Sequence, residues 1–270
     1  MKALILTLTA FCCALSAQDS SSRITVPFSD PSQPRRVVAS MMQGCFTVEG
    51  YDGKDVIIEP RGAGGERPVR PVPRNAEGMK RIEPAGMGIS VEEENNTVKI
   101  HSSLGRGRDL LVRVPFATSL KLECMNGGDI KVDRVSGDLE LQNLNGAVTA
   151  NSVSGSVIAH SLNGRVLVTL DKVTAEKPMS FSSLNGDVDV TLPGDARGTV
   201  RMKTDHGEIF SDFDIKISAS TAAPLVEDGR SKGGRYRVKM DGTTTGSLNG
   251  GGPDLTFKTF NGNIYIRKKK

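Results

Sequence analysis

A glycine recurs every nine residues in the middle of the chain. From Val135 the sequence reads VSGDLELQN, LNGAVTANS, VSGSVIAHS and LNGRVLVTL. The dipeptide that ends at each glycine alternates between Ser-Gly and Asn-Gly, so the true period is 18 residues in two nine-residue halves. Repetition at a fixed period is typical of architectures in which neighbouring units stack on one another.

Within each half, apolar residues fall two, four and seven positions after the glycine. Alternation over four or five residues is the period of a β-strand with one buried and one wet face. We therefore expect an inward set formed by Leu139, Leu141, Leu144, Val148, Ala150, Val153, Val157, Ala159 and Leu162. The outward set is Asp138, Glu140, Ala147, Thr149, Ser156, Ile158 and His160.

The glycines and the asparagines before them are predicted to form the turns between strands. Glycine accepts positive φ without a Cβ clash, and Asn-Gly and Ser-Gly are common in turns. Further copies of the unit begin at Leu184, Asp205 and Phe260. The structural turn residues are predicted to be Gly127, Gly137, Asn145, Gly146, Gly155, Asn163, Gly164, Asn185, Gly186, Gly207, Asn261 and Gly262.

Two architectures could use such units, and strand register separates them. In an antiparallel hairpin closed at Asn145-Gly146, Leu139 would face Ser152, so apolar and polar residues would meet. If strands instead stack in parallel every 18 residues, Leu139 meets Val157 and every apolar position aligns. The pattern favours an all-β fold with a parallel β-solenoid-like repeat domain, built from 18-residue rungs of two nine-residue halves, with irregular β flanks.

The composition agrees with a turn-rich β-protein, because the chain has 30 Gly, 13 Pro and no Trp. We expect a flexible N-terminal segment over 18–36 and a single β-repeat domain over 37–270. Inside this domain, 60–88 reads as a loop rich in Pro, Gly and Arg, and 219–234 as a second loop. The arginines and lysines of the first loop could meet an anionic partner: Arg61, Arg67, Arg70, Arg74, Lys80 and Arg81.

The first residues predict export. Lys2 precedes an apolar run from Ala3 to Leu15 that is shorter than the roughly 20 residues a membrane span needs, and small residues follow. We read 1–17 as a signal peptide, with a lipoprotein signal at Cys12 or Cys13 as the competing reading. The expected location is the periplasm, the outer membrane or the outside of the cell. No later segment is long and apolar enough to span a bilayer.

Two cysteines, Cys45 and Cys124, remain after the signal, and in an oxidising compartment they could form one disulfide. The alternative is a pair of buried thiols that serve as small apolar groups. The formal net charge of +4, or +3 without Lys2, is too small to indicate nucleic-acid binding. The basic end, Arg267 to Lys270, reads as a solvated tail, or as a charged cap on the last strand edge if that edge is open.

A search for catalytic or metal-binding patterns predicts no cofactor and no metal. His101, His160 and His206 stand singly, and no catalytic or metal-binding signature occurs. The residue after each repeat glycine does not supply the recurring Asp of a calcium β-roll. A β-helix polysaccharide enzyme is the best catalytic alternative, and its acidic residues would be Asp187, Asp189, Asp212 and Asp214.

Several stretches of this chain resemble the bacterial putative-adhesin family, a β-strand-repeat group of unknown function. They include GYDGKDVIIEP, ISVEEENNTVKI, VSGDLELQNLNGAV, KPMSFSSLNGDVDVTLP, TDHGEIFSDFDI and GGPDLTFKTFNGNIYIRK, in order from Val37 to Lys268. The resemblance implies an exported or envelope-associated β-repeat protein with no assigned catalytic residues.

We therefore expect a non-catalytic, adhesin-like binding or surface-interaction module of the bacterial envelope. Its partner would be an envelope or surface protein or a glycan, and not a nucleic acid. Two alternatives stay open: a structural envelope protein that self-associates through its strand edges, and the polysaccharide enzyme.

Overall fold

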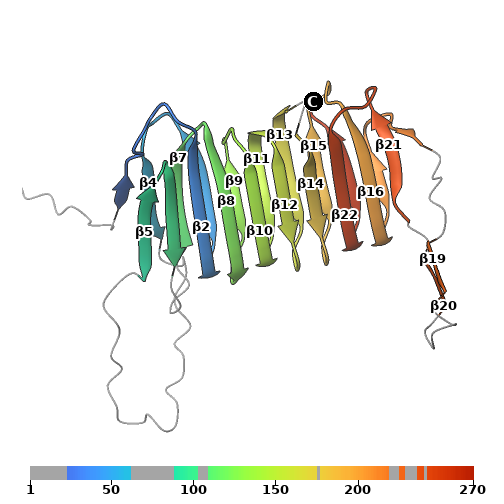
Figure 1. The fold of residues 1–270 in the computed structure, drawn as a ribbon, viewed down its shortest axis with the longest axis horizontal. Helices are drawn as coiled ribbons and strands as arrows, with labels where there is room; N and C mark the ends of the chain where they lie inside the picture. The colour runs from blue at the N-terminus through green and yellow to red at the C-terminus, as the bar shows by residue number, and fades with distance from the viewer. Residues whose placement is uncertain are drawn as a thin grey trace, which may run out of the picture.

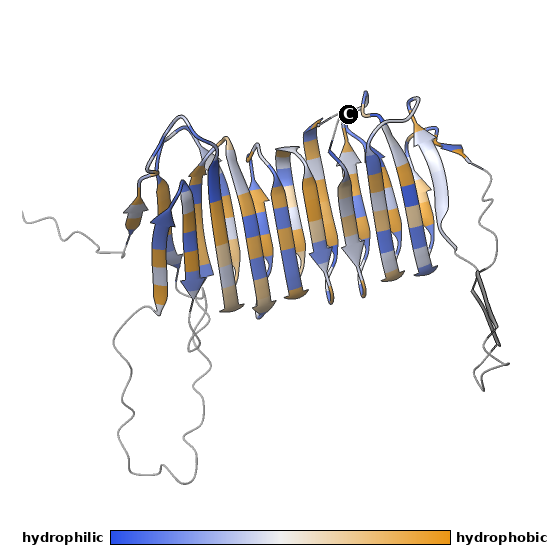
Figure 2. Ribbon diagram, viewed as in Figure 1, coloured by the Kyte–Doolittle hydropathy of each residue, from blue (hydrophilic) through white to orange (hydrophobic). Residues whose placement is uncertain are grey.

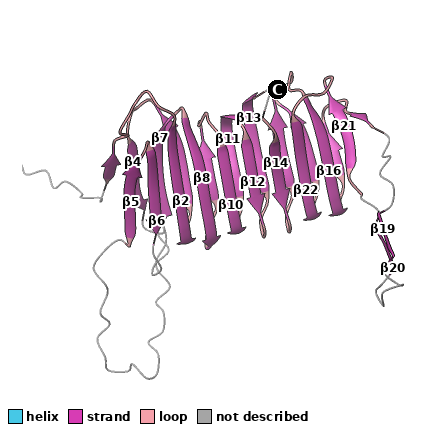
Figure 3. Ribbon diagram, in the orientation of Figure 1, coloured by secondary structure: helices cyan, strands magenta, loops and turns pink. Residues whose placement is uncertain are grey.

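The computed structural model describes residues 23–61, 88–102, 109–174, 177–218, 225–228, 236–239 and 242–270. In these residues the chain forms strands and connecting loops and no helix (Figure 3). None of them belongs to a helix long and apolar enough to cross a membrane. The expected signal peptide over 1–17 lies outside the described residues, as does most of the basic loop, of which only its first cation, Arg61, is described.

Two large mixed sheets make up the body of the protein (Figure 1). Sheet A has ten strands, in the spatial order β1 (Ile24–Val26), β4 (Val56–Arg61), β7 (Asp109–Pro115), β3 (Phe46–Tyr51), β9 (Ile130–Asp133), β11 (Val148–Gly155), β13 (Val166–Val173), β15 (Val188–Leu192), β23 (Ile264–Lys268) and β17 (Ile209–Ser211). Neither large sheet closes into a barrel, because each strand order has two ends.

Sheet B has eleven strands and runs alongside sheet A. Its spatial order is β18 (Lys216–Ile217), β21 (Thr244–Leu248), β16 (Gly198–His206), β22 (Asp254–Asn261), β14 (Met179–Ser183), β12 (Val157–Ser161), β10 (Leu139–Asn145), β8 (Thr118–Asn126), β2 (Arg35–Gln43), β6 (Thr97–Ser102) and β5 (Ile89–Glu94). A separate two-stranded sheet joins β19 (Leu225–Asp228) to β20 (Tyr236–Lys239).

The core lies between the two sheets, because alternate residues of the strands are buried there. Hydrophobic and hydrophilic residues accordingly alternate along many of the strands (Figure 2). On β10, Leu139 and Leu141 are buried, while Gln142 is exposed on the outer face. The same alternation on β11 buries Val148 and Ala150. Each buried aliphatic side chain contributes roughly 1.5–3 kcal/mol before conformational entropy is subtracted.

From β8 to β15 the strands alternate between sheet B and sheet A, and neighbours within each sheet are parallel. We call one strand of sheet B with the following strand of sheet A a rung.

The predicted register is confirmed in the centre, where Leu139 pairs with Val157 and Val148 pairs with Val166. The antiparallel hairpin at Asn145-Gly146 is not formed. Successive rungs are offset by 18 residues there, and by 19 and 22 on either side.

Two inward predictions are wrong, at Leu144 and at Leu162, which is only partly buried. Leu144 is 41% exposed, whereas Val153, its equivalent in the next half, is fully buried. On β10 the strict alternation continues through buried Asn143, so Leu144 points outward. On β11 the register shifts between Ala150 and Val153, and Ser152 takes φ of 50°, so this bulge turns Val153 back to the core.

The first and last rungs do not lie at the ends of the body. Strand β2 lies between β6 and β8, and β3 lies between β7 and β9. In the same way β22 lies between β14 and β16, and β23 between β15 and β17. Segments far apart in the sequence therefore become parallel neighbours, and the two terminal rungs are paired on both sides.

Antiparallel strands flank these parallel rungs. At one end β4 pairs with β1 and β7, and β5 pairs with β6. Phe28 is buried there, beside the β1 strand that falls within the expected 18–36 segment. At the other end β21 pairs with β16 and β18. Strand β19 falls within the expected loop over 219–234.

Candidate functional site: the rim of sheet B

The carboxyl ends of the sheet B strands form a rim along the long axis of the molecule (Figure 1). A ladder of asparagine side chains runs along this rim. The Nδ2 of each residue donates to the Oδ1 of the one before it, at 2.7–2.8 Å, in the order Asn126, Asn145, Asn163, Asn185 and Asn261. Such ladders form when identical amides stack on in-register parallel strands. The ladder therefore fixes the register of five rungs.

A second row of polar groups lies just inside the rim. The hydroxyls of Ser161, Ser183 and Thr259 donate to the carbonyl oxygens of Gly146, Gly164 and Gly186 at 2.8–2.9 Å. Equivalent donors in other rungs are Cys124 to Gly44, Asn143 to Gly128 and Thr204 to Gly262. A buried carbonyl without a donor is costly, so these residues satisfy the backbone of each turn.

The rim glycines are needed mainly for close approach. The turn glycines are predicted from the sequence to have positive φ. Among the predicted turn glycines, only Gly127, Gly155 and Gly262 have positive φ. At Gly146 and Gly164 a Cβ would overlap the carbonyl oxygen of the glycine one rung away. The backbones of successive turns therefore stack with no room for a side chain. The same overlap with a neighbouring backbone carbonyl occurs at Gly137, Gly186 and Gly207.

An apolar row lies on the outer side of the rim, where each member directly precedes the ladder position of its strand. We call this row the ridge, and it consists of Met42, Met125, Leu144, Leu162, Leu184 and Phe260. Five of the six are 38–48% exposed, and Leu162 is partly buried. With neighbouring strands about 4.8 Å apart, the ridge is about 24 Å long. Beside its end lies His206, at the ladder position of β16, whose ring meets Phe260 edge-on at 5.0 Å, whereas the ridge position of β16 holds Asp205.

The ridge is unusual because other outward positions of the same strands vary in chemistry. Two residues before the ridge position on each strand lies another outward row. It contains Glu123, Gln142, His160, Ser182 and Lys258. The ridge position, although equally outward, holds a large apolar residue in six rungs. Exposed rows of this kind mark interaction sites more often than isolated apolar residues do. The sequence carries a signal for the ridge, since an apolar residue stands before each ladder asparagine, but the nine-residue pattern predicts that Leu144 and Leu162 belong to the core.

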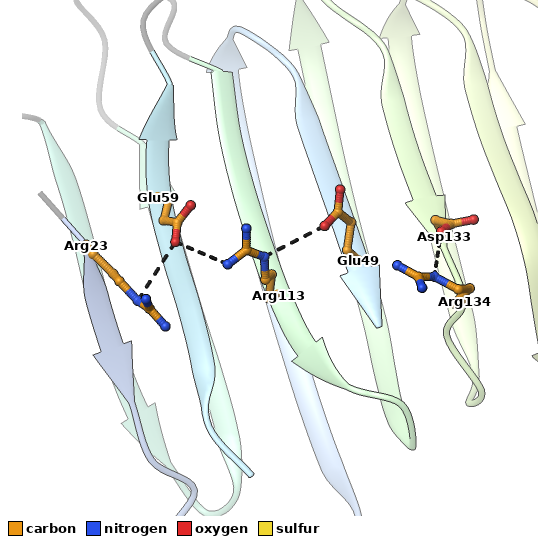
Figure 4. Close-up of polar contacts among 6 residues, drawn as sticks. All are labelled: Arg23, Glu49, Glu59, Arg113, Asp133 and Arg134. Carbon is orange, nitrogen blue, oxygen red and sulfur yellow. Dashed lines mark hydrogen bonds and ion pairs between the residues drawn. The ribbon is translucent and has the colours of Figure 1, made fainter. Parts of the chain in front are cut away.

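The outer face of sheet A is charged. A row of ion pairs crosses four neighbouring strands, from Arg23 to Glu59 (3.8 Å), from Glu59 to Arg113 (3.4 Å) and from Arg113 to Glu49 (3.7 Å) (Figure 4). On the next strand Asp133 pairs with Arg134 at 2.8 Å. Exposed pairs of this type contribute only about 0–1 kcal/mol each. Ion pairs also occur on sheet B, where Lys121 pairs with Glu140 at 2.8 Å. Exposed apolar residues also occur away from the rim, such as Phe116 and Phe210. The ridge differs from them because its members form one row.

Both cysteines are free thiols in the structure. The Cys124 Sγ donates to the Gly44 carbonyl at 3.1 Å, and Cys45 follows Gly44 in the chain. Burial, assisted by a hydrogen bond to Asp109, raises the pKa of Cys45 to about 12. Burial also raises the pKa of Cys124. The structure thus places the two cysteines of the expected disulfide in one region, as neutral thiols.

Three of the four acidic residues of the enzymatic alternative have partners of their own, and the fourth, Asp214, is exposed. Asp189 holds Arg267 through two nitrogens at 2.8 and 2.9 Å, and Asp187 accepts the Asn263 amide at 2.7 Å. Asp212 accepts the Lys268 amide at 3.2 Å. Within the described ranges, no three His, Cys, Asp or Glu side chains are grouped as a metal site would require.

Arg267 lies on β23, which is an inner strand between β15 and β17. The expectation that the basic end caps an open sheet edge is therefore wrong. Lys269 pairs with Asp171 at 2.6 Å, so part of this cluster is tied to the body. Of the histidines, His101 contacts Ser40 and His160 contacts Ser182, each at 2.9 Å.

Among the solved structures that this chain resembles are two distant likenesses. One is the crystal structure of a putative cell adhesion protein from Clostridium sporogenes, with a TM-score of 0.39, 10% identity, and coverage of 92% of this chain and 99% of that one. The other is a putative adhesin from Bacteroides fragilis, with a TM-score of 0.35, 13% identity, and coverage of 93% and 98%. No protein-family model and no curated protein matches the sequence.

Proposed function

We propose that this chain is an exported, non-catalytic binding module of the bacterial envelope that acts in an adhesin-like manner. Its rungs form a β-solenoid-like coil, and the coil presents the ridge to a surface protein or a glycan. A stack of rungs suits this role because each added rung extends the same surface by about 4.8 Å.

The observation that carries the proposal is the recurrence of exposed apolar side chains at one repeat position. Leu144 and Leu184 are 40–41% exposed and Phe260 is 42% exposed, although solvation alone would favour polar residues there. The neighbouring Gln142 and Ser182 offer hydrogen bonds, and Glu123 and Lys258 in the same outward row add charged groups. An apolar row bordered by polar and charged groups has the composition of a protein-interaction surface, with an apolar centre and a polar rim.

The test is a binding titration of the labelled mature chain on intact cells of the producing bacterium and on purified envelope glycan. We expect saturable binding to one of them and no release of reducing sugar from the glycan. Reducing-sugar release would support the polysaccharide enzyme instead. Binding that does not saturate on either surface would contradict the proposal.

A further inference from the structure

The C-terminal segment fills a slot that the rest of the chain forms. Strand β22 pairs in parallel with β14 on one side and with β16 on the other. Strand β23 pairs in the same way with β15 and β17. The residues that meet across β15 and β23, such as Val188 and Ile264, are 76 positions apart, so this rung inserts between strands made earlier.

The contacts in the slot are specific. Phe257 stacks on Phe181 with ring centroids 5.3 Å apart, and the Asn261 amide extends the asparagine ladder from Asn185. On the sheet A side, the Arg267 guanidinium donates two hydrogen bonds to the Asp189 carboxylate. On the far wall, Thr204 donates to the Gly262 carbonyl and the Glu208 amide donates to the Asn263 side chain, both at 2.9 Å. The segment is thus recognised by both walls.

The connection into this segment is built to change direction. Residues 249–253 read NGGGP, and Asn249, Gly250, Gly251 and Gly252 all have positive φ, at 47°, 92°, 85° and 154°. At Gly250 and Gly251 a Cβ would meet nothing within 4 Å, so the body does not confine the middle of the loop. On either side of these glycines, Asn249 donates to the Ala196 carbonyl at 2.8 Å and Thr199 donates to the Gly252 carbonyl at 3.3 Å. Leu248, directly before the loop, is fully buried, and its burial holds the end of β21 in the body of the chain.

We infer that the slot between β14/β15 and β16/β17 is a strand-accepting site, and that its ligand is residues 254–268 of a second copy of this chain. Reciprocal exchange re-forms every slot contact between the two copies. The exchanged dimer and the monomer, in which the segment fills the slot of its own chain, then differ only in the loop conformation and in the concentration dependence of assembly. The loop reaches about 20 Å, so the two bodies lie side by side.

Exchange goes beyond the proposed function and would couple two ridges. Because Phe260 lies on β22, each ridge in the exchanged dimer would contain one residue from the other copy. The resulting surface is bivalent, which raises apparent affinity for a repetitive ligand without any new contact.

The experiment uses the full mature chain with Cys45 and Cys124 changed to serine. Ser180 and Thr256 are paired on β14 and β22, within disulfide reach. The single variants Ser180→Cys and Thr256→Cys, carrying different tags, are mixed, unfolded, refolded at rising concentration and oxidised. We expect a covalent heterodimer whose yield increases at least tenfold between 1 and about 100 µM.

The matched control is the pair Glu140→Cys and Ile158→Cys, which are neighbours on β10 and β12 in the middle of the coil and should give no heterodimer. Deleting Gly250 and Gly251 should raise the dimer fraction in the otherwise unmodified chain, and inserting ten Gly/Ser residues there should lower it. A monomer at every concentration in both loop variants would overturn the inference. A dimer that forms without a disulfide between the cysteines introduced by Ser180→Cys and Thr256→Cys would also overturn it. Neither result bears on binding by the monomer.

Discussion

Gly164 shows how closely successive turns approach. A Cβ on this residue would overlap the Gly146 carbonyl, which is rigid backbone held in the next rung. We predict that Gly164→Ala lowers the free energy of unfolding by about 1–3 kcal/mol, as overpacking does. Gly242→Ala is the control, because a Cβ there meets nothing within 4 Å. Equal urea midpoints for the two variants would show that the turns can separate at little cost.

The hydroxyl of Ser161 is fully buried and satisfies the Gly146 carbonyl at 2.9 Å. Ser161→Ala leaves that carbonyl without a donor, and we predict a loss of about 1–3 kcal/mol in unfolding free energy. Ser180, which lies on the outward side of β14, is the matched position, and Ser180→Ala should change stability by under about 0.5 kcal/mol. Chemical denaturation of both variants decides whether the inner polar row stabilises the fold.

Cys45 predicts a specific pH dependence. Its pKa is raised to about 12 by burial, from an ordinary value of 9.0. The unfolded thiol therefore ionises first, so its contribution to stability is complete below pH 9 and is lost as the pH rises from 9 towards 12. Cys45→Ser should flatten the stability curve over this interval, measured by urea denaturation at stepped pH. An unchanged slope would mean that the folded thiol ionises normally.

At the scale of elements, Asp substitutions at two consecutive residues of β12 test which face of the strand is buried. Val157 is fully buried and Ile158 is 47% exposed. Val157→Asp places an unpaired charge in the core and should lower the free energy of unfolding by at least about 3 kcal/mol. Ile158→Asp should be tolerated. Thermal unfolding followed by circular dichroism compares them, and equal midpoints would contradict the burial pattern.

The central rungs could be predicted from the sequence because the period is strict there. Leu139, Leu141, Val148 and Ala150 alternate with polar residues, and only parallel pairing at 18 residues aligns them. The orientation of Leu144 could not be predicted by analogy with Val153. The bulge at Ser152 depends on backbone geometry that the two similar halves do not share.

At the scale of the whole molecule, local patterns do not reveal which rungs are neighbours. The terminal rungs carry ordinary strand alternation, but their insertion between other rungs joins residues such as Val188 and Ile264 across 76 positions. The ridge was also missed for a physical reason, because apolar residues at a repeat position normally indicate core. Only the three-dimensional path shows that Met125, Leu184 and Phe260 lie on the outer side of the rim.

The central claim is that the ridge is apolar because it binds a partner, and not because the fold needs it. The most direct measurement is cell binding by the mature chain, by Leu144→Ser and by Leu144→Ser/Leu184→Ser, with Ile158→Ser as the control for an exposed apolar residue outside the ridge. The account predicts that apparent affinity falls stepwise, by about tenfold for each ridge residue (about 1.4 kcal/mol), while Ile158→Ser binds like the original chain and all four proteins unfold at similar urea concentrations. Affinity that is independent of the ridge, or that falls equally with Ile158→Ser, would contradict it.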